Sequence, residues 1–265
     1  MQTVPYSNSP FLSFGGAYDP AAQAFFSANP GVTDTSQKNA VNRLVLDLKA
    51  ASLFTPTKIQ ALWPVVGGTA DAHRYNLLDP STFLLAYGAG ITHGPGGLRG
   101  DGTGMVTTGY LPNRDMTGDT LHLGLYVRDL AVAQWDMGAV QAGDVVQGLI
   151  INRANGLTCS DIGNDGTYTT GPTATSPGFF VGSRTAANAH ALYANGSLIG
   201  TNNGTTPTPV KKAGTEIALC GTTGVTDFST KQVALASVGP GLSVSEVAAY
   251  AAAVQTFQTA LGRQV

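Results

Sequence analysis

The sequence contains little charge and almost no glutamate. Of its 265 residues 11% are charged, with 14 Lys and Arg against 16 Asp and Glu, for a net charge of -2. Neutralisation of phosphates by clustered Lys and Arg dominates the affinity of proteins for nucleic acids. Since the sequence has no basic stripe, we expect neither DNA nor RNA as a partner and no polybasic contact with a membrane surface.

Cysteine is also scarce. The two cysteines, Cys159 and Cys220, do not form a CxxC motif, and no histidines stand at the spacing of a zinc site. Both are expected to be small, buried, apolar residues. Whether they pair is left open, because a disulfide requires the two positions to be neighbours in space.

Long apolar runs are missing as well. No uncharged stretch reaches the roughly 18 residues that a membrane-spanning helix requires. Residues 1–10 lack the charged and apolar regions of a signal peptide. We therefore expect a protein that is made in a cytoplasm and is not inserted into a membrane.

Glycine and other turn formers are abundant, with 34 glycines in the chain. Asn195-Gly196, between two apolar runs, is the strongest hairpin signal, because a type I′ turn needs positive φ at both positions. Asn155-Gly156 is a second. Many short strands without a βαβ pattern predict an antiparallel sandwich. The candidate strands are residues 82–87, 105–108, 120–127, 145–152, 156–160, 167–169, 178–183, 190–194, 198–201, 216–221 and 232–238.

Helical signals precede the strands. Asp19-Pro20, an N-cap followed by proline, predicts a helix over residues 21–28. Ser36 is expected to cap a second helix, whose apolar residues recur at three- and four-residue spacing. Thr55-Pro56 repeats the first signal and predicts a brief helix over residues 57–63.

A further helix is expected at the end of the chain. Ser243 and Glu246 form a capping box before a helix over residues 243–262. Its apolar residues share one face, and Gly262 stands where a helix-terminating glycine belongs. We expect this face to pack on the sandwich.

Four segments resemble a family of tailed-bacteriophage virion proteins, namely tail, fibre or minor structural proteins with a concanavalin A-like (laminin-G-like) domain. The last segment is the most distinctive: a strand, a Gly-x-Gly-Leu-Ser turn and a capped helix ending in Leu-Gly-Arg. The others contain Gly-Gly-Thr-Ala, Gly-x-Thr-His, and an aromatic strand before an Asn-Gly turn. In chain order the four segments are residues 40–80, 90–112, 178–200 and 233–263.

The resemblance implies a mainly β fold, an antiparallel concanavalin A-like jelly-roll sandwich. A helical lead-in over residues 1–75 would precede the sandwich of residues 76–265. It also implies a location in the virion, with other virion proteins and copies of this chain as partners and host cell-surface glycans as a further contact. We expect a structural or adhesion protein; the alternatives are a lectin for host recognition, dependent on calcium or not, and a glycan hydrolase.

The sequence lacks the usual acidic strand of enzymes with this fold. They carry Glu-x-Asp-x-Glu or a close variant, which places carboxyl groups on one sheet face. The only glutamates are Glu216 and Glu246. Glu246 is explained by the capping box, and no acidic residue follows Glu216 at the required spacing. With no G-x-S-x-G motif either, we expect no enzymatic activity, and paired aspartates from separate strands are the remaining route to hydrolysis.

Two motifs near the start of the sandwich have structural explanations. His73 and His93 are single histidines, which are more often hydrogen-bonded structural residues than general bases. The glycine-rich segment 94–104 lacks the Gly-Lys-Ser/Thr ending of a phosphate-binding loop. We predict a turn-rich loop there.

Sugar binding usually needs an exposed aromatic ring with polar neighbours. The candidates are Trp135 with Asp136, and Tyr110 with Asn113 and Arg114. Tyr168 is a further aromatic candidate. For each ring the alternative is packing in the core of the sandwich.

Calcium is the one cofactor considered. Asp161, Asn164 and Asp165 lie in a short polar segment whose oxygens are of the type that Ca²⁺ binds. The alternative is a polar turn, since Asn and Asp tolerate left-handed backbone conformations.

Overall fold

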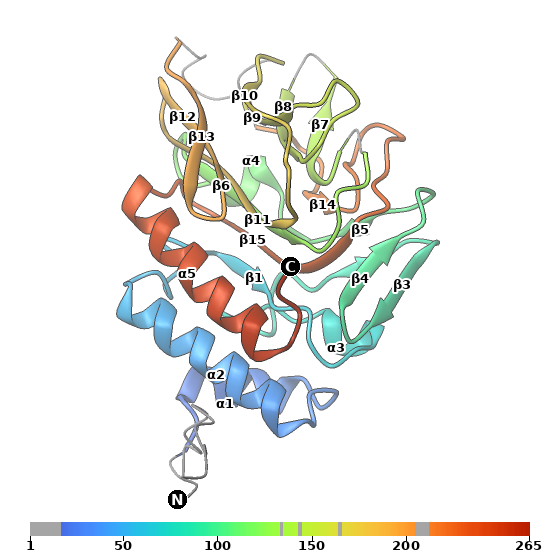
Figure 1. Cartoon of the computed structure of the whole chain (residues 1–265), viewed down its shortest axis with the longest axis vertical. Helices are drawn as coiled ribbons and strands as arrows, with labels where there is room; N and C mark the ends of the chain where they lie inside the picture. The colour runs from blue at the N-terminus through green and yellow to red at the C-terminus, as the bar shows by residue number, and fades with distance from the viewer. Residues whose placement is uncertain (1–16, 133–134, 143–144, 164–165, 205–211) are drawn as a thin grey trace, which may run out of the picture.

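The computed structural model describes residues 17–132, 135–142, 145–163, 166–204 and 212–265. They form three layers (Figure 1): helices α1, α2 and α5 lie together on one side, a first β-sheet lies against them, and a second sheet containing β7, β8 and β9 lies on the far side. In the described part of the chain, no helix is long and apolar enough to cross a membrane.

The larger sheet lies in the middle of the three layers. Its described strands run in the order β13-β12-β11-β6-β15-β4-β3, and β1 also pairs with β15. Every pairing in it is antiparallel. Its strands are β1 (Ala61–Trp63), β3 (Ile91–Gly94), β4 (Gly97–Gly100), β6 (Leu121–Val127), β11 (Gly178–Ala186), β12 (Ala189–Ala194), β13 (Ser197–Asn202) and β15 (Gln232–Gly239).

The smaller sheet is also antiparallel and runs β10-β9-β8-β7-β14-β5-β2 among the described residues. The two sheets face each other, so the predicted fold class, a mainly β antiparallel sandwich, is confirmed. The strands of the smaller sheet are β2 (Ala86–Tyr87), β5 (Val106–Thr107), β7 (Met137–Gln141), β8 (Val145–Ile150), β9 (Thr158–Ile162), β10 (Thr169–Gly171) and β14 (Ala218–Leu219).

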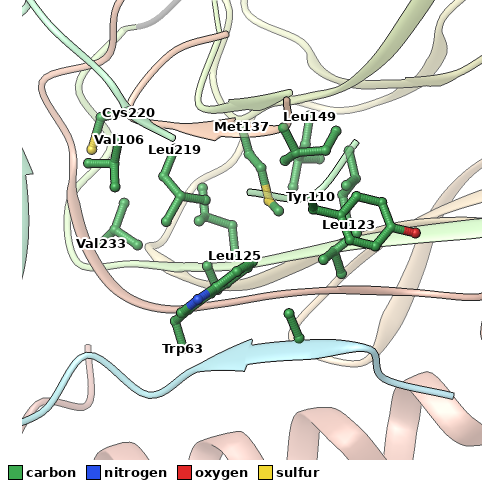
Figure 2. Packing of buried hydrophobic residues seen from close by; sticks show 14 of the residues in the cluster. Trp63, Val106, Tyr110, Leu123, Leu125, Met137, Leu149, Leu219, Cys220 and Val233 are labelled. Carbon is green, nitrogen blue, oxygen red and sulfur yellow. The ribbon is translucent and has the colours of Figure 1, made fainter. Parts of the chain in front are cut away.

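The main hydrophobic core lies between the two sheets (Figure 2). Met137, Leu149 and Leu219 point into it from the smaller sheet, and Leu123 and Leu125 from β6. Trp63 enters from β1 with no exposed surface, and its indole N–H donates to Phe83 O at 2.7 Å. The polar end of this large side chain is thereby satisfied inside the core.

A second core lies between the larger sheet and the helices. Tyr126 of β6 and Phe179 of β11 point to this side, because alternate residues of a strand face opposite directions. The helices contribute one face each, including Phe25, Leu44 and Val254. The helices are α1 (Pro20–Ala28), α2 (Thr35–Ala50) and α5 (Val244–Ala260), and two short helices, α3 (Ala70–His73) and α4 (Pro112–Asp115), lie in connections.

The helix ends largely follow the sequence signals. Asp19 caps α1 by accepting from Ala21 N at 2.9 Å, and Ser243 and Glu246 form both bonds of the predicted capping box of α5. The predicted cap of α2 is wrong by two residues. Asp34 accepts from Gln37 N at 2.8 Å, so the helix already begins at Thr35.

The predicted helix over residues 57–63 is also wrong. A turn follows Thr55, whose carbonyl accepts from Ile59 N at 2.8 Å, and the chain then extends as β1. β1 pairs with Val238, Ser237 and Ala236 of β15, which places Trp63 in the main core. Burial of this large ring outweighs the weak local preference for helix.

The glycine-rich segment 94–104, predicted as a loop, instead contributes a β-hairpin. β3 and β4 pair from Ile91 with Gly100 to Gly94 with Gly97. Gly97 has φ +125 and lies against the backbone of Val233, where a side chain would collide. The glycines thus allow a tight hairpin that joins β15. The hairpin predicted at Asn195-Gly196 is confirmed, with φ 49 and 81 at the two turn residues.

Arg263 joins the helical layer to the sandwich. Its side chain is 4% exposed. The guanidinium donates to Val65 O at 2.7 Å, to Ala234 O at 3.0 Å and to Gln258 Oε1 at 2.9 Å. Burial lowers the pKa of Arg263 to about 9, and the charge of Arg128 adds to this effect. No local pattern in the sequence indicates that Arg263 is buried, because its partners Val65 and Ala234 are distant in sequence.

Arg263→Ala is expected to lower the free energy of unfolding by about 3 kcal/mol or more, because buried carbonyls lose their donors. Urea denaturation measures this change. The control is Arg43→Ala, which removes an exposed ion pair with Asp47 on α2 and is expected to cost less than about 1 kcal/mol. Equal effects of the two substitutions would contradict a joining role for Arg263.

Candidate functional site

A separate apolar cluster lies on the outer face of the smaller sheet, the face turned away from the larger sheet. We call it the outer patch. The register of β8 and β9 places these apolar residues on the outer face. Ile150 pairs with Cys159 there, while the adjacent pair, Leu149 and Ser160, points to the inner face. The outer patch consists of the buried residues Trp135, Val146, Ile150 and Cys159 and the partly buried Val140, Leu157 and Tyr168.

Trp135 forms the base of the outer patch. It is only 8% exposed, and its ring lies directly over Gly148 of β8, where any Cβ would collide with it. The ring of Tyr168 lies beside it, with centroids 6.2 Å apart and planes at 44°. Trp135 was a candidate for an exposed platform, with packing in the core as the alternative. At 8% exposure its ring is packed, whereas Tyr168 beside it is half-buried.

Arg153 lies against Tyr168. The centre of its guanidinium is 5.1 Å from the centroid of the tyrosine ring. The backbone of Arg153 is fixed by the β8–β9 turn, through bonds with Gly156 N and Leu157 O, each 2.8 Å long. Burial raises the pKa of Tyr168, and the charge of Arg153 opposes that rise. Sequence reasoning missed Arg153, since only the fold brings it next to Tyr168.

Asp136, the predicted partner of Trp135, is not available to a surface ligand. It is 1% exposed and forms an ion pair with Lys231, which has no exposed surface. The two distances from Lys231 Nζ to the carboxylate oxygens are 2.9 and 3.1 Å. Ser229 Oγ and Ile151 N donate to the same carboxylate, each at 2.6 Å. A buried charge needs this complete set of partners, so the residue has a structural role.

In the second predicted sugar site, the aromatic ring is buried while the two polar residues are exposed. Tyr110 has no exposed surface, and its hydroxyl donates to Gln60 Oε1 at 2.8 Å. Asn113 and Arg114 are exposed on α4, where the guanidinium forms two bonds of 2.7 Å with Asp115. The ring therefore belongs to the core, and these residues provide no aromatic surface.

Of the three predicted calcium ligands, Asp161 is the one that lies within the described residues. Asp161 has no exposed surface and accepts from Gly166 N at 2.9 Å, as expected for a polar turn. Asn164 and Asp165 lie outside the described residues. In the part of the chain that is described, no group of three or more His, Cys, Asp and Glu side chains converges as for a metal ion. Calcium binding stays a prediction.

The two cysteines are free and lie in different cores. Cys159 belongs to the outer patch and Cys220 to the main core. Burial raises the pKa of the Cys220 thiol to about 12. Both thiols are therefore small buried side chains, as predicted.

Two serine–histidine contacts lie inside the protein. Ser237 Oγ is 3.4 Å from His122 Nε2, and Ser160 Oγ is 3.3 Å from His190 Nε2. All four residues are 2% exposed or less. Burial lowers the pKa of His122 to about 4 and that of His190 to about 3. The contacts stabilise the interior, since no substrate reaches these serines in the folded state.

His73 and His93 form a pair whose proton positions follow from the backbone. Gly68 N donates to His73 Nε2 at 3.1 Å, so the neutral ring carries its proton on Nδ1. That proton is directed to His93 Nδ1, 3.0 Å away. Burial, with the charges of His93 and Arg263, lowers the pKa of His73 to about 3. The pair joins α3 to β3, which supports the structural role expected for both histidines.

Two surface hollows elsewhere lack charged side chains. One lies between β2 and β5 and is lined by Tyr87, Met105, Phe228 and small residues. The other lies between the Asn195-Gly196 turn and the alanines of α5. The outer patch differs from both because an aromatic ring and a cation meet there.

Comparison with known proteins gives a likeness in fold. No family model and no curated protein matches the chain. A Trypanosoma rangeli sialidase holding 2,3-difluorosialic acid as a covalent intermediate is similar, with a TM-score of 0.50 and 14% identity over 84% of this chain and 39% of that chain. The same sialidase with the inhibitor DANA has a TM-score of 0.51 and 14% identity, over 80% and 37%. Domain 4 of AbnA, an arabinanase from Geobacillus stearothermophilus, has a TM-score of 0.44 and 11% identity, over 74% and 100%.

The prediction that the chain is not an enzyme is contradicted by this comparison. The solved structures that share its fold include a sialidase caught as a covalent intermediate. The absence of a Glu-x-Asp-x-Glu strand therefore does not exclude glycan chemistry. The chain spans about two fifths of the length of the sialidase, and at 14% identity the likeness shows the fold alone. None of these structures is named as a virion protein, so that assignment stays a prediction.

Stability is expected to fall as the pH is lowered from 7 to 5. His73, His122 and His190 stay neutral in the folded protein, while the unfolded chain binds protons below a pKa of about 6.5. Each depressed pKa thus contributes stability that is complete above about pH 6.5 and is lost below it. The loss at pH 5.5 is on the order of 1 kcal/mol per histidine.

Urea denaturation between pH 7 and 5 tests this expectation, and its slope should correspond to the uptake of about three protons on unfolding. His190→Gln should reduce the slope by about one proton. A flat profile over this range would contradict neutral buried histidines.

Proposed function

We propose that this protein binds carbohydrate at the outer patch. The observation that carries the proposal is the half-buried ring of Tyr168, with the guanidinium of Arg153 at 5.1 Å, on the sheet face that the helices leave uncovered. The apolar face of a sugar packs on an aromatic ring, while its hydroxyls bind planar donors such as guanidinium.

The residues of the outer patch have separate tasks in this proposal. Tyr168 provides the stacking surface, and Arg153 provides hydrogen-bond donors beside it. Trp135 packs beside Tyr168, and Gly148 leaves the space for the indole ring. Trp135 lies just before β7, Arg153 lies in the β8–β9 turn, and Tyr168 directly precedes β10. Because the strands of the smaller sheet hold all three, little order has to be gained on binding, which favours affinity.

The solved structures with this fold support carbohydrate as the ligand class, because the sialidase contains 2,3-difluorosialic acid. The further placement of the module in a tailed-phage particle is also proposed. It rests on the resemblance of the four sequence segments alone. There it would contact other virion proteins and copies of itself and would bind glycans of the host surface.

Tyr168→Ala is expected to weaken glycan binding about tenfold, because stacking contributes about 1 kcal/mol or more. A glycan array identifies the ligand, and titration calorimetry then measures the dissociation constants. Tyr18→Ala, on the helical side of the molecule, is the matched control and should leave affinity unchanged. Tyr168→Phe should retain most of it, since the stacking ring remains.

Two outcomes would contradict the proposal: no glycan bound by the unchanged protein, or equal affinity of the Tyr168→Ala variant with thermal unfolding unchanged. A parallel array with EDTA tests the predicted calcium. Loss of binding with chelator would support a metal-dependent mode, whereas unchanged binding would restrict recognition to the side chains of the outer patch.

A further inference from the structure

Arg153 is half-buried, and its partners differ from those of three exposed arginines. Arg43, Arg99 and Arg114 are each paired with an aspartate, at nitrogen–oxygen distances of 2.8, 2.6 and 2.7 Å. Within the described ranges, no carboxylate forms an ion pair with Arg153. Its charge therefore remains available at the surface of the outer patch.

Arg153 makes two contacts within the outer patch, one with the ring of Tyr168 and one with the thiol of Cys159. The central carbon of the guanidinium lies over the ring of Tyr168, 5.1 Å from its centroid, as in a cation–π contact. The N–H groups of a guanidinium lie in its plane and match the two oxygens of a carboxylate. Burial raises the pKa of the Cys159 thiol, and the charge of Arg153 and a side-chain hydrogen bond from it oppose that rise. The thiol is neutral and takes up only part of the five N–H donors of the guanidinium. These contacts orient the cation without neutralising it.

Among the described residues, Asp161 is an acidic group whose charge acts on the outer patch. Asp161, two residues after Cys159 on β9, raises the pKa of Tyr168, so its charge reaches the outer patch. Its carboxylate is nevertheless fully buried and accepts from Gly166 N. An anion that approaches from solvent therefore meets the half-buried Arg153 before it meets Asp161.

We infer that the carbohydrate bound at the outer patch is acidic, a sugar that carries a carboxylate. The carboxylate binds the guanidinium of Arg153, and the adjoining ring of the sugar contacts the part of the Tyr168 ring that Arg153 leaves exposed. This inference rests on the proposed function and adds the chemical class of the ligand. A charge-assisted hydrogen bond is stronger than a neutral one, so the carboxylate becomes the main determinant of selectivity.

The test uses pairs of oligosaccharides that differ only in the acidic group: sialyllactose against lactose, and an oligosaccharide of glucuronic acid against its carboxyl-reduced form. The whole chain is expected to bind one acidic member at least about tenfold more tightly than its neutral partner. This preference should decrease as salt is raised from 50 to about 500 mM, because the site is open to solvent.

Arg153→Gln should remove the preference while leaving weak binding of the neutral member. Arg153→Lys should keep part of it, since the charge remains but the planar fork is lost. Arg43→Gln, an exposed arginine on α2, is the matched control and should change neither affinity. Thermal unfolding of each variant confirms that the fold is retained.

The outcomes separate the two proposals. Equal binding of acidic and neutral members by the unchanged chain would overturn the acidic ligand and keep the proposed function. A preference for acidic members that survives Arg153→Gln would overturn the role of Arg153. Binding of neither member of any pair, together with an empty glycan array, would overturn the proposed function itself.

Discussion

The architecture depends on one constraint, which is that the central strands of the larger sheet are apolar on both faces. Every residue of β6 is buried, with Leu123 and Leu125 on one side and Tyr126 on the other. Such strands have to be covered twice, and an uncovered side would leave large apolar areas in water. The smaller sheet covers one face, and helices from both ends of the chain cover the other.

This arrangement determines where a ligand can bind. Once the helices occupy one side of the larger sheet, the exposed sheet surface is the outer face of the smaller sheet. There Trp135 packs against Gly148 and beside Tyr168, and the β8–β9 turn positions Arg153. The outer patch thus combines packed aromatic rings with the cation of Arg153. Among the described residues, no carboxylate forms an ion pair with this cation. The buried pair of Asp136 and Lys231 lies behind it and stabilises the frame rather than contacting solvent.

Local sequence signals predicted the features that depend on neighbouring residues. The Asn195-Gly196 hairpin and the Ser243–Glu246 capping box need only a few consecutive residues, and both are present. Features that depend on distant partners were not predictable in the same way. Asp136 was predicted to bind a ligand because the sequence around it contains no partner for its charge. The partner is Lys231, 95 positions away. Residues 57–63 were predicted as a helix from their local cap signal. The strand that makes β1 extended, β15, comes much later in the sequence. No local sequence pattern indicated that Arg153 belongs to the site, since only the fold places it next to Tyr168. The absence of one acidic motif was also too weak a basis for excluding catalysis.

The position of β15 has a consequence for how the chain folds during synthesis. β15 follows every other described strand in sequence, yet it lies between β6 and β4 in the larger sheet and also pairs with β1. Until residues 232–239 leave the ribosome, β1 and the β3–β4 hairpin lack their partner in that sheet. A topology with such long-range pairing folds slowly, and the unpaired edges of the nascent chain are open to association with other chains. Efficient production is therefore expected to depend on chaperones that protect these edges until the last strand arrives.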